Sequence, residues 1–328
     1  MPTFYVSDQI HEDVLAQLAS LGQVHLGYGK DAVTYESISH EVDAVLLRAE
    51  RFDRDKIAAS PRLRIIARHG VGTDNVDIDS ATAAGIWVTT TPGSNSRAVA
   101  EHVFALLLSM ARNVPYGSAA TAQGQWSEAK PHMVGFELHG KTLGLLGFGN
   151  ISRMVLDIAK GFGMHALVHD PYVEAAGIEA AGAQPATLAQ AIAGSDVLSL
   201  HLPLTEQTTH LIDAVALATM RRGAVLINTS RGGLVDETAL VTALRDGHLA
   251  AAGLDVLEGE SVDMKDPLPH SRIPVGGVPN LIVTPHVAGQ SAEAFLAAGT
   301  AALAAIRCAL AGDVPPHAVN TVAIPAYK

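Results

Sequence analysis

Three side chains suited to acid–base and anion-binding chemistry lie far apart in the chain, each within a short motif. Arg231 lies in Ile-Asn-Thr-Ser-Arg-Gly-Gly-Leu-Val-Asp, Glu260 lies five residues after Asp255, and His286 lies in Thr-Pro-His-Val-Ala-Gly. Imidazole titrates near neutral pH, which makes His286 the candidate proton donor or acceptor. Glu260 would hydrogen-bond the other ring nitrogen and favour the protonated ring. Arg231 offers a forked, permanently charged donor for a carboxylate and a carbonyl oxygen.

A nucleotide-binding turn precedes these motifs. The predicted strand 142–147 runs into a helix through Gly147-Phe148-Gly149-Asn150-Ile151. The first glycine would make the tight turn, and the second would let backbone amides approach a pyrophosphate at the helix N-terminus. Ser152 stands where the fingerprint has a third glycine, which predicts altered packing without loss of binding. Two glycines alone are more often structural, so the assignment depends on the residues that come after the turn.

Asp170 closes the next predicted strand, 23 residues after Gly147. A carboxylate there can accept hydrogen bonds from both ribose hydroxyls and would repel a 2′-phosphate. The alternative is an ordinary turn residue before Pro171. The pattern therefore predicts NAD rather than NADP, and a nicotinamide cofactor makes a metal unnecessary. His165 and His169 lie four apart on a predicted strand, so they do not form a helical metal pair.

The elements that position these residues alternate between short apolar runs and helical patterns, which predicts an α/β fold with parallel sheets. The first series ends near Thr91-Pro-Gly-Ser-Asn95. A long apolar helix follows over 98–112, and a second series starts at Lys141. No strand follows the helix after Ser291, so that helix is expected to return to the first domain. We expect two Rossmann-like, doubly wound domains: a discontinuous substrate-binding domain (1–97 and 287–328) and an NAD-binding domain (98–286).

Composition limits the partners and the compartment. The net charge of −11 over 328 residues argues against nucleic acid or an anionic membrane as a partner, because phosphates would be repelled. Cys308 is the single cysteine, which excludes an intrachain disulfide and favours a reducing compartment. The N-terminus lacks the features of a signal peptide, and the apolar stretch near 294–311 is alanine-rich and broken by Arg307. These features predict a cytoplasmic protein that does not span a membrane.

With these motifs in place, the chain resembles the D-isomer-specific 2-hydroxyacid dehydrogenases, within them the phosphoglycerate dehydrogenase branch. The resemblance covers nearly the whole chain, including Arg68-His-Gly-Val-Gly-Thr-Asp-Asn-Val-Asp77, Ala100-Glu-His102, the Gly147 turn, His201-Leu-Pro-Leu, Asn228–Glu237 and Pro285-His-Val-Ala-Gly289. It implies two Rossmann-like domains with the active site in the cleft. It also implies hydride transfer between NAD and a small 2-hydroxy acid, with Arg231, Glu260 and His286 as the catalytic residues.

The resemblance also assigns binding residues. The residues expected beside the cofactor are His201, Leu202, Pro203 and Thr208 along the nicotinamide half, Thr229, Ser230 and Arg231 at the next strand end, Asp255 on the carboxamide, and His286 with Gly289. The backbone amides of Val71 and Gly72 would complete the carboxylate site. Arg48 and Arg68 match arginines near the substrate in phosphoglycerate-type members; surface ion pairing is an equal alternative for both.

The resemblance further implies a homodimer formed through helix 98–112 and the following arm, with Trp126 and Pro131. Two departures affect the expected edge of the cleft: Ser261 replaces a proline common after the catalytic glutamate, and residues 269–280 form an insertion. The chain stops soon after Val319-Asn320, so no C-terminal regulatory domain is expected.

Two other functions remain open on the sequence. One is an NAD(H)-sensing binding protein, like the transcriptional corepressors that share this fold and triad and usually carry extra tails. The other is an enzyme like formate dehydrogenase, which has glutamine where this chain has Glu260. The sequence does not choose among hydroxypyruvate, glyoxylate, 3-phosphohydroxypyruvate and related 2-oxo acids.

Overall fold

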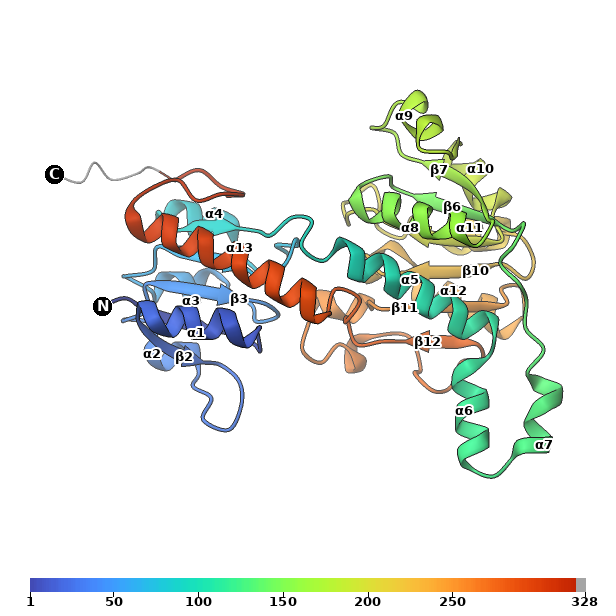
Figure 1. Cartoon of the computed structure of the whole chain (residues 1–328), viewed down its shortest axis with the longest axis horizontal. Coiled ribbons are helices and arrows are strands. Elements are labelled where there is room, and N and C mark those ends of the chain that lie inside the picture. The colour runs from blue at the N-terminus through green and yellow to red at the C-terminus, as the bar shows by residue number, and fades with distance from the viewer. Residues whose placement is uncertain (323–328) are drawn as a thin grey trace. The chain divides into compact units, whose positions relative to one another are not determined.

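The structure is a computed structural model that describes residues 1–322 and divides into two compact units (Figure 1). The small unit comprises residues 1–95 together with the described residues from Gln290 onward, and the large unit comprises Ser96–Gly289. Each unit contains a parallel sheet with helices between its strands. The expected α/β class with two Rossmann-like sheets is therefore confirmed.

The small unit is built on a five-stranded parallel sheet in the order β2-β1-β3-β4-β5. The strands are β1 (Thr3–Val6), β2 (Gln23–Leu26), β3 (Ala44–Leu47), β4 (Ile65–Arg68) and β5 (Trp87–Thr89). All but β2 are buried along their full length, because helices cover both faces of the sheet. This explains why they appear in the sequence as continuous apolar runs.

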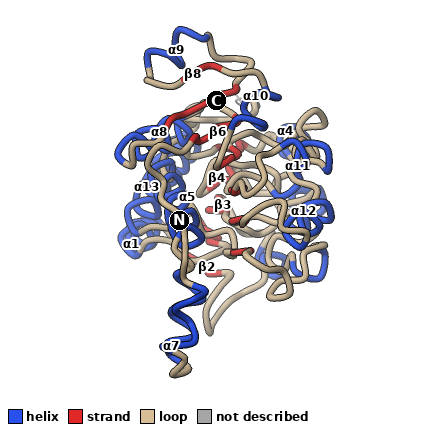
Figure 2. The backbone as a smooth tube through the Cα atoms, turned by 90° about the vertical axis from the view of Figure 1, so that its right-hand side faces the viewer, coloured by secondary structure: helices blue, strands red, loops and turns tan. Residues whose placement is uncertain are grey.

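Helices cover the two faces of the small sheet separately. The helices are α1 (Glu12–Leu21), α2 (Tyr35–Ile38), α3 (Arg54–Ala58), α4 (Ile78–Ala83) and α13 (Ala292–Ala311). α1 and α13 bury apolar residues with β1, β3 and β4 on one face, whereas α2 to α4 form a second core on the other (Figure 2). α13 is long and apolar enough to cross a membrane by length and composition alone. Its residues Ala302, Leu303 and Ile306 lie in the first of these cores, so it serves here as a core helix.

The large unit contains a seven-stranded parallel sheet in the order β12-β11-β10-β9-β6-β7-β8. The strands are β6 (Thr142–Leu146), β7 (His165–His169), β8 (Gln184–Pro185), β9 (Val197–Leu200), β10 (Val225–Asn228), β11 (Ala251–Leu254) and β12 (Leu281–Val283). The chain runs outward from β6 to β8, then crosses back to β9 on the other side of β6. Ligands of open α/β sheets bind at the carboxyl ends of the strands beside such a switch point.

The helices of the large unit also form two layers. They are α5 (Ser96–Ala111), α6 (Val114–Ala122), α7 (Trp126–Ala129), α8 (Asn150–Gly161), α9 (Ala175–Ala180), α10 (Leu188–Gly194), α11 (Ala214–Thr219) and α12 (Glu237–Arg245), with short 3₁₀ turns η1 (Lys130–His132), η2 (Gly232–Leu234), η3 (Glu258–Ser261) and η4 (Leu268–His270). α5 and α8 share one apolar core, and α10, α11 and α12 share the other. α11 and α12 lie on the opposite side of the strands from α8 (Figure 2).

Aspartates set the starts of several short helices. Asp53, Asp77, Asp213 and Asp236 each accept a hydrogen bond from the third backbone amide of the helix that follows. Such caps satisfy amides that have no partner within the helix and contribute about 1 kcal/mol each. The Asp236 cap bears on function, because it starts α12 directly after the Arg231 motif.

Candidate active site

His286 and Glu260 meet in the large unit. Nδ1 of His286 lies 2.6 Å from Oε2 of Glu260, and the other carboxylate oxygen accepts the Leu257 amide at 2.9 Å. Because a carboxylate can only accept, Nδ1 carries the ring hydrogen that joins the pair. The Glu260 side chain is 12% exposed and that of His286 is 41% exposed. The pair thus combines a sheltered carboxylate with an imidazole that solvent or a substrate can reach.

Arg231 is brought to the same region by a close contact between two loops. A Cβ added to Gly232 would lie 2.0 Å from the carbonyl carbon of Leu257, so the Arg231 loop and the Glu260 loop touch backbone to backbone. The turn before Arg231 is held by buried Asn228, whose side chain accepts the Ser230 amide at 3.0 Å and donates to the Arg231 carbonyl at 2.8 Å. The prediction named Arg231 and Glu260, but the role of Asn228 as the fixed centre of this turn was missed.

The loop that carries His286 is organised by Asp255, which follows β11 and is 1% exposed. Its carboxylate accepts hydrogen bonds from the hydroxyl of Thr284 and from the amides of Val287 and Ala288. The resemblance assigns Asp255 to the nicotinamide carboxamide, and that role stays a prediction. The hydrogen bonds present show a second task, which is to hold the turn on both sides of His286.

The glycine turn has the geometry that a dinucleotide requires. Gly147 has φ +91°, and a Cβ there would lie 2.5 Å from the His201 carbonyl oxygen, so a larger residue is excluded on both counts. Nothing lies within 4 Å of the Cβ position of Gly149, which caps α8. Asp170 accepts the Phe148 amide at 2.7 Å and the Tyr172 amide at 2.9 Å. Its carboxylate is therefore fixed beside the turn.

Three buried polar atoms near this edge of the sheet have no hydrogen-bond partner among residues 1–322. They are Oγ of Ser152, Nδ1 of His201 and Oγ1 of Thr229. Unpaired buried polar groups are costly, and His201 and Thr229 directly follow neighbouring strands β9 and β10. A polar cofactor at the switch point would supply partners to such atoms. Burial lowers the pKa of His201 to about 4, so its ring is neutral and presents one acceptor nitrogen.

The remaining predicted cofactor residues occupy loops at the same edge. Thr208 donates to the Pro203 carbonyl at 2.7 Å and accepts the Thr205 amide at 2.7 Å, so its hydroxyl shapes its own loop. Ser230 donates to the Leu200 carbonyl at 2.7 Å. Asn150 and Ile151 form the first turn of α8, Leu202 follows His201, and Gly289 ends the large unit.

The predicted substrate residues Arg48, Arg68, Val71 and Gly72 lie in the small unit, at the carboxyl ends of β3 and β4. Arg48 stacks over the Phe295 ring at 4.5 Å and donates to the Gln9 carbonyl at 2.9 Å. Burial lowers its pKa, yet arginine stays charged at any working pH.

Arg68 is mostly occupied with backbone. It is 9% exposed and donates to the carbonyls of Gly72 at 2.8 Å, Leu47 at 3.1 Å and Arg48. It therefore braces the turn that carries Val71, whereas Arg48 retains the more accessible guanidinium. Sequence reasoning also missed His69, which follows Arg68 and whose pKa is lowered to about 4 by burial and by the charge of Arg48.

The insertion at 269–280 is anchored by Glu237, a buried carboxylate at the start of α12. Glu237 accepts hydrogen bonds from the Glu258 amide at 2.8 Å, the Ser271 hydroxyl at 2.8 Å and the Arg272 amide at 2.7 Å. The insertion is thus tied to the loop of Glu260, and Ile273 and Val278 add to the core. Glu237 ends a motif that carries the resemblance, but the motif did not show that its carboxylate anchors residues 271 and 272, which are remote in the chain.

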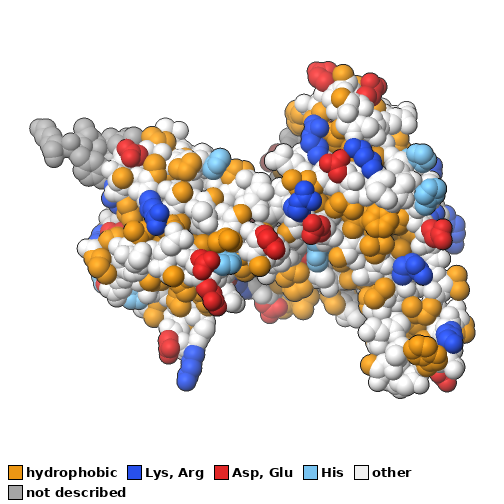
Figure 3. All heavy atoms as spheres, in the orientation of Figure 1, with side chains coloured by type: hydrophobic (Ala, Val, Ile, Leu, Met, Phe, Trp, Pro, Cys, Tyr) orange, Lys and Arg blue, Asp and Glu red, His pale blue; other side chains and the backbone are white. Residues whose placement is uncertain are grey.

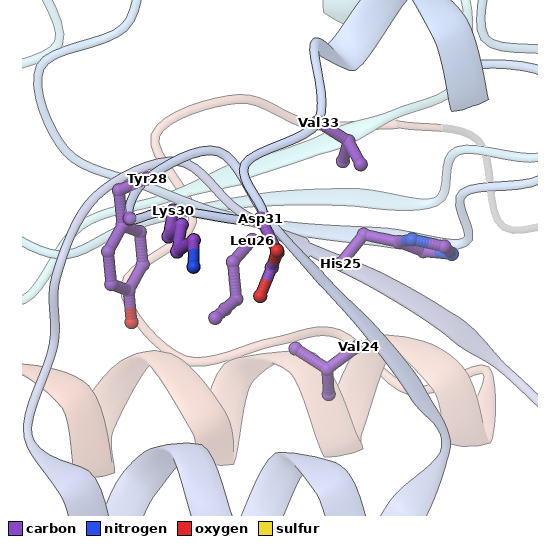
Figure 4. Close-up of a pocket in the computed structure, with 8 residues that line it drawn as sticks. Val24, His25, Leu26, Tyr28, Lys30, Asp31 and Val33 are labelled. Carbon is purple, nitrogen blue, oxygen red and sulfur yellow. The ribbon is translucent and has the colours of Figure 1, made fainter.

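A separate cavity of about 360 Å³ lies beside β2 in the small unit (Figure 4). It is lined by Val24, His25, Leu26, Tyr28, Gly29, Lys30, Asp31 and Val33. None of the predicted site residues lines it. Among residues 1–322, no group of three or more His, Cys, Asp or Glu side chains is placed to hold a metal ion.

Known proteins resemble this chain in sequence and in structure. The family model described as D-isomer specific 2-hydroxyacid dehydrogenase, NAD binding domain, matches residues 104–288. The D-3-phosphoglycerate dehydrogenase of Mycobacterium tuberculosis (strain CDC 1551 / Oshkosh) is 38% identical over 98% of this chain and 59% of its own length. This chain therefore spans less than two thirds of that relative.

Two further proteins match over nearly their whole length. The glyoxylate reductase of Aeropyrum pernix is 37% identical, with 97% of this chain and 96% of that protein covered. The apo-structure of D-lactate dehydrogenase from Escherichia coli superimposes with a TM-score of 0.84 at 28% identity, over 98% of this chain and 100% of that one.

Proposed function

Because the chain belongs to the D-isomer specific 2-hydroxyacid dehydrogenase family, we propose that it interconverts a small 2-hydroxy acid and its 2-oxo acid with NAD as cofactor. The hydrogen bond of 2.6 Å between His286 and Glu260 carries the proposal. A nucleotide-sensing protein of this fold could carry the same pair, so reduction of a 2-oxo acid is the property that separates the two functions. We assign cofactor binding to the large unit and part of the substrate contacts to the small unit.

The residues of the large unit fit a dinucleotide. Gly147 is required by the tight turn against the His201 carbonyl, and the space beside Gly149 is open for a pyrophosphate. A bound dinucleotide would also offer polar partners to Nδ1 of His201 and Oγ1 of Thr229. Asp170, already held by two amides, would accept the ribose hydroxyls with its remaining lone pairs and disfavour a 2′-phosphate. These features support NAD over NADP.

The chain's own residues would manage the proton and the substrate charge. A bound nicotinamide would supply or accept the hydride. In reduction, His286 would donate its Nε2 proton to the substrate oxygen while its Nδ1 hydrogen stays in the bond to Glu260. Arg231 would bind the carboxylate and the carbonyl oxygen. Oxidation uses the same groups in reverse, with His286 as the base.

The test is a panel of 2-oxo acids with NADH, followed at the nicotinamide absorbance, for the parent and His286→Ala. The panel contains glyoxylate, hydroxypyruvate, pyruvate, 3-phosphohydroxypyruvate and 3-sulfopyruvate, because two relatives are named for glyoxylate and 3-phosphoglycerate. His286→Ala should lower turnover by roughly 10²–10⁴-fold with NADH binding nearly intact. A parent that binds NADH but reduces no member of the panel would favour the sensing function instead.

We further propose a cytoplasmic homodimer. The arm formed by α6, α7 and the segment that follows η1 exposes apolar side chains (Figure 3), among them Tyr116 at 46%, Trp126 at 63% and Val134 at 84% exposed. Exposed apolar patches of this kind mark interaction surfaces, which supports the dimer. The presence of one cysteine, Cys308, fits a reducing compartment and supports the cytoplasmic location. Light scattering at micromolar concentration should give twice the chain mass of 34.1 kDa; a mass of one chain would contradict the dimer.

A further inference from the structure

We propose that His102 on α5 is a positioning residue for His286, acting through Thr284 and Asp255 on the turn that carries the imidazole. The inference rests on the proposed function, because it concerns the residue proposed to transfer the proton. It adds a residue that the proposed mechanism does not use, and it gives Asp255 a role that does not depend on a bound cofactor.

The first step is the conformation of His286 itself. Its φ is +52°, in the left-handed region. For a residue other than glycine this conformation costs about 1–2 kcal/mol, although histidine tolerates it better than most. Such a backbone persists only where the surroundings impose it. The direction of the imidazole therefore depends on whatever holds the turn.

Asp255 supplies most of that hold. Oδ1 accepts the Thr284 hydroxyl at 2.6 Å and the Val287 amide at 2.9 Å, and Oδ2 accepts the Ala288 amide at 2.8 Å. The backbone carbonyl of Asp255 also accepts the His286 amide at 2.9 Å. One residue thus binds the turn before, at and after His286. These bonds also compensate the burial of the charge.

His102 on α5 contacts both Thr284 and Asp255. Its Nε2 lies 3.0 Å from Oγ1 of Thr284 and 3.6 Å from Oδ1 of Asp255. The Thr284 hydroxyl already gives its hydrogen to the carboxylate, so its oxygen can only accept from His102. Nε2 of His102 is therefore the donor, and the chain of donors runs from His102 through Thr284 to Asp255.

The place of His102 is fixed by close packing of α5 on β11. A Cβ added to Gly253 of β11 would lie 3.0 Å from Met110 and 3.1 Å from Leu106, both on α5. The helix also buries Val103 and Leu107 in the core. His102 therefore projects from a rigid element, which is the property that a positioning group requires.

The test compares Thr284→Val with Thr284→Ser. Valine has the shape of threonine but can neither accept from His102 nor donate to Asp255, whereas serine retains both bonds. We expect Thr284→Val to lower kcat roughly 10–100-fold, the scale of a misplacement of about 1 Å. The KM for the 2-oxo acid should change far less. Thr284→Ser should keep kcat within about threefold of the parent. Side-chain volume would not explain this difference, because valine is closer to threonine in volume than serine is.

His102→Leu and His102→Gln provide a second pair that leaves the turn itself unchanged. The leucine variant should lose part of kcat and the glutamine variant should regain it, because an amide N–H can replace the imidazole donor. In a double-mutant cycle, His102→Leu should add little to Thr284→Val, since the bond is already gone. Fully additive losses of kcat would contradict the chain of hydrogen bonds from His102 through Thr284 to Asp255.

A readout independent of turnover separates this inference from the proposed function. A crystal structure of Thr284→Val should show His286 outside the left-handed region, whether or not the protein reduces any 2-oxo acid. A parent inactive on the whole panel would count against the proposed function alone. His286 retained at positive φ in Thr284→Val, or an unchanged kcat in that variant, would overturn the positioning role.

Discussion

Replacing Gly232 by alanine should separate the Arg231 loop from the Glu260 loop. The new Cβ would lie 2.0 Å from the Leu257 carbonyl carbon, 2.2 Å from its oxygen and 2.3 Å from the Glu258 amide nitrogen. All three are backbone atoms, so no side-chain rotation relieves the contact. Real Cβ atoms stay at least 3.0 Å from such neighbours, and the loops must therefore part by about 1 Å.

The expected loss follows from that displacement. A shift of about 1 Å in a residue that positions the substrate costs roughly 100-fold in kcat/KM. Forcing an extra methyl group into a packed site also lowers the free energy of unfolding by about 1–3 kcal/mol. Steady-state kinetics on the best 2-oxo acid and urea unfolding measure the two effects separately.

Gly233→Ala is the matched control, one residue away. A Cβ at Gly233 would meet only side-chain carbons of Leu204, at 3.0 Å and 3.2 Å, and Leu204 is partly exposed and can yield. This variant should keep kcat/KM within about threefold of the parent, because surface side chains adjust at little cost. The reasoning is refuted if Gly232→Ala is as active as Gly233→Ala.

Three further predictions concern charge. Glu260→Gln should lower kcat, because a neutral amide accepts a weaker hydrogen bond from Nδ1 of His286 than a carboxylate does; an unchanged kcat would argue against the pair. Asp170 should make NADH preferred over NADPH by roughly tenfold or more, and Asp170→Asn should narrow that ratio of kcat/KM values. Burial lowers the pKa of His69 and of His201 to about 4, below the value near 6.5 expected once unfolded. The unfolded chain then binds more protons between these values, so the free energy of unfolding should be highest above about pH 6.5 and fall toward pH 4; urea midpoints independent of pH would contradict this.

The sequence predicts the elements whose residues are buried on both faces. The strand predicted over 142–147 is observed as Thr142–Leu146, and all but its first residue are buried. The strand Gln23–Leu26 was missed, because it lies at the sheet edge, is half exposed and contains glutamine and histidine. Edge strands of this kind carry no continuous apolar signal.

The site was only partly open to sequence reasoning. Arg231, Glu260 and His286 were named from motif and resemblance, and the structure places His286 against Glu260. The supporting residues Asn228, Glu237 and His102 lie within motifs that carry the resemblance. Their supporting roles depend on neighbours that are remote in the chain, so the motifs alone did not show them. Likewise, the sequence does not distinguish Gly232 from Gly233. Only the structure shows that the Leu257 backbone leaves no room for a side chain at Gly232.

The left-handed backbone of His286 has a consequence for how this protein would respond to engineering. Glycine and asparagine adopt a backbone with φ +52° at the lowest conformational cost. A screen that rewards heat resistance alone would therefore drift toward replacing the residue proposed to handle the proton. Activity and stability make opposite demands at this one position, and a variant library for this protein should hold residue 286 fixed while it seeks robustness elsewhere.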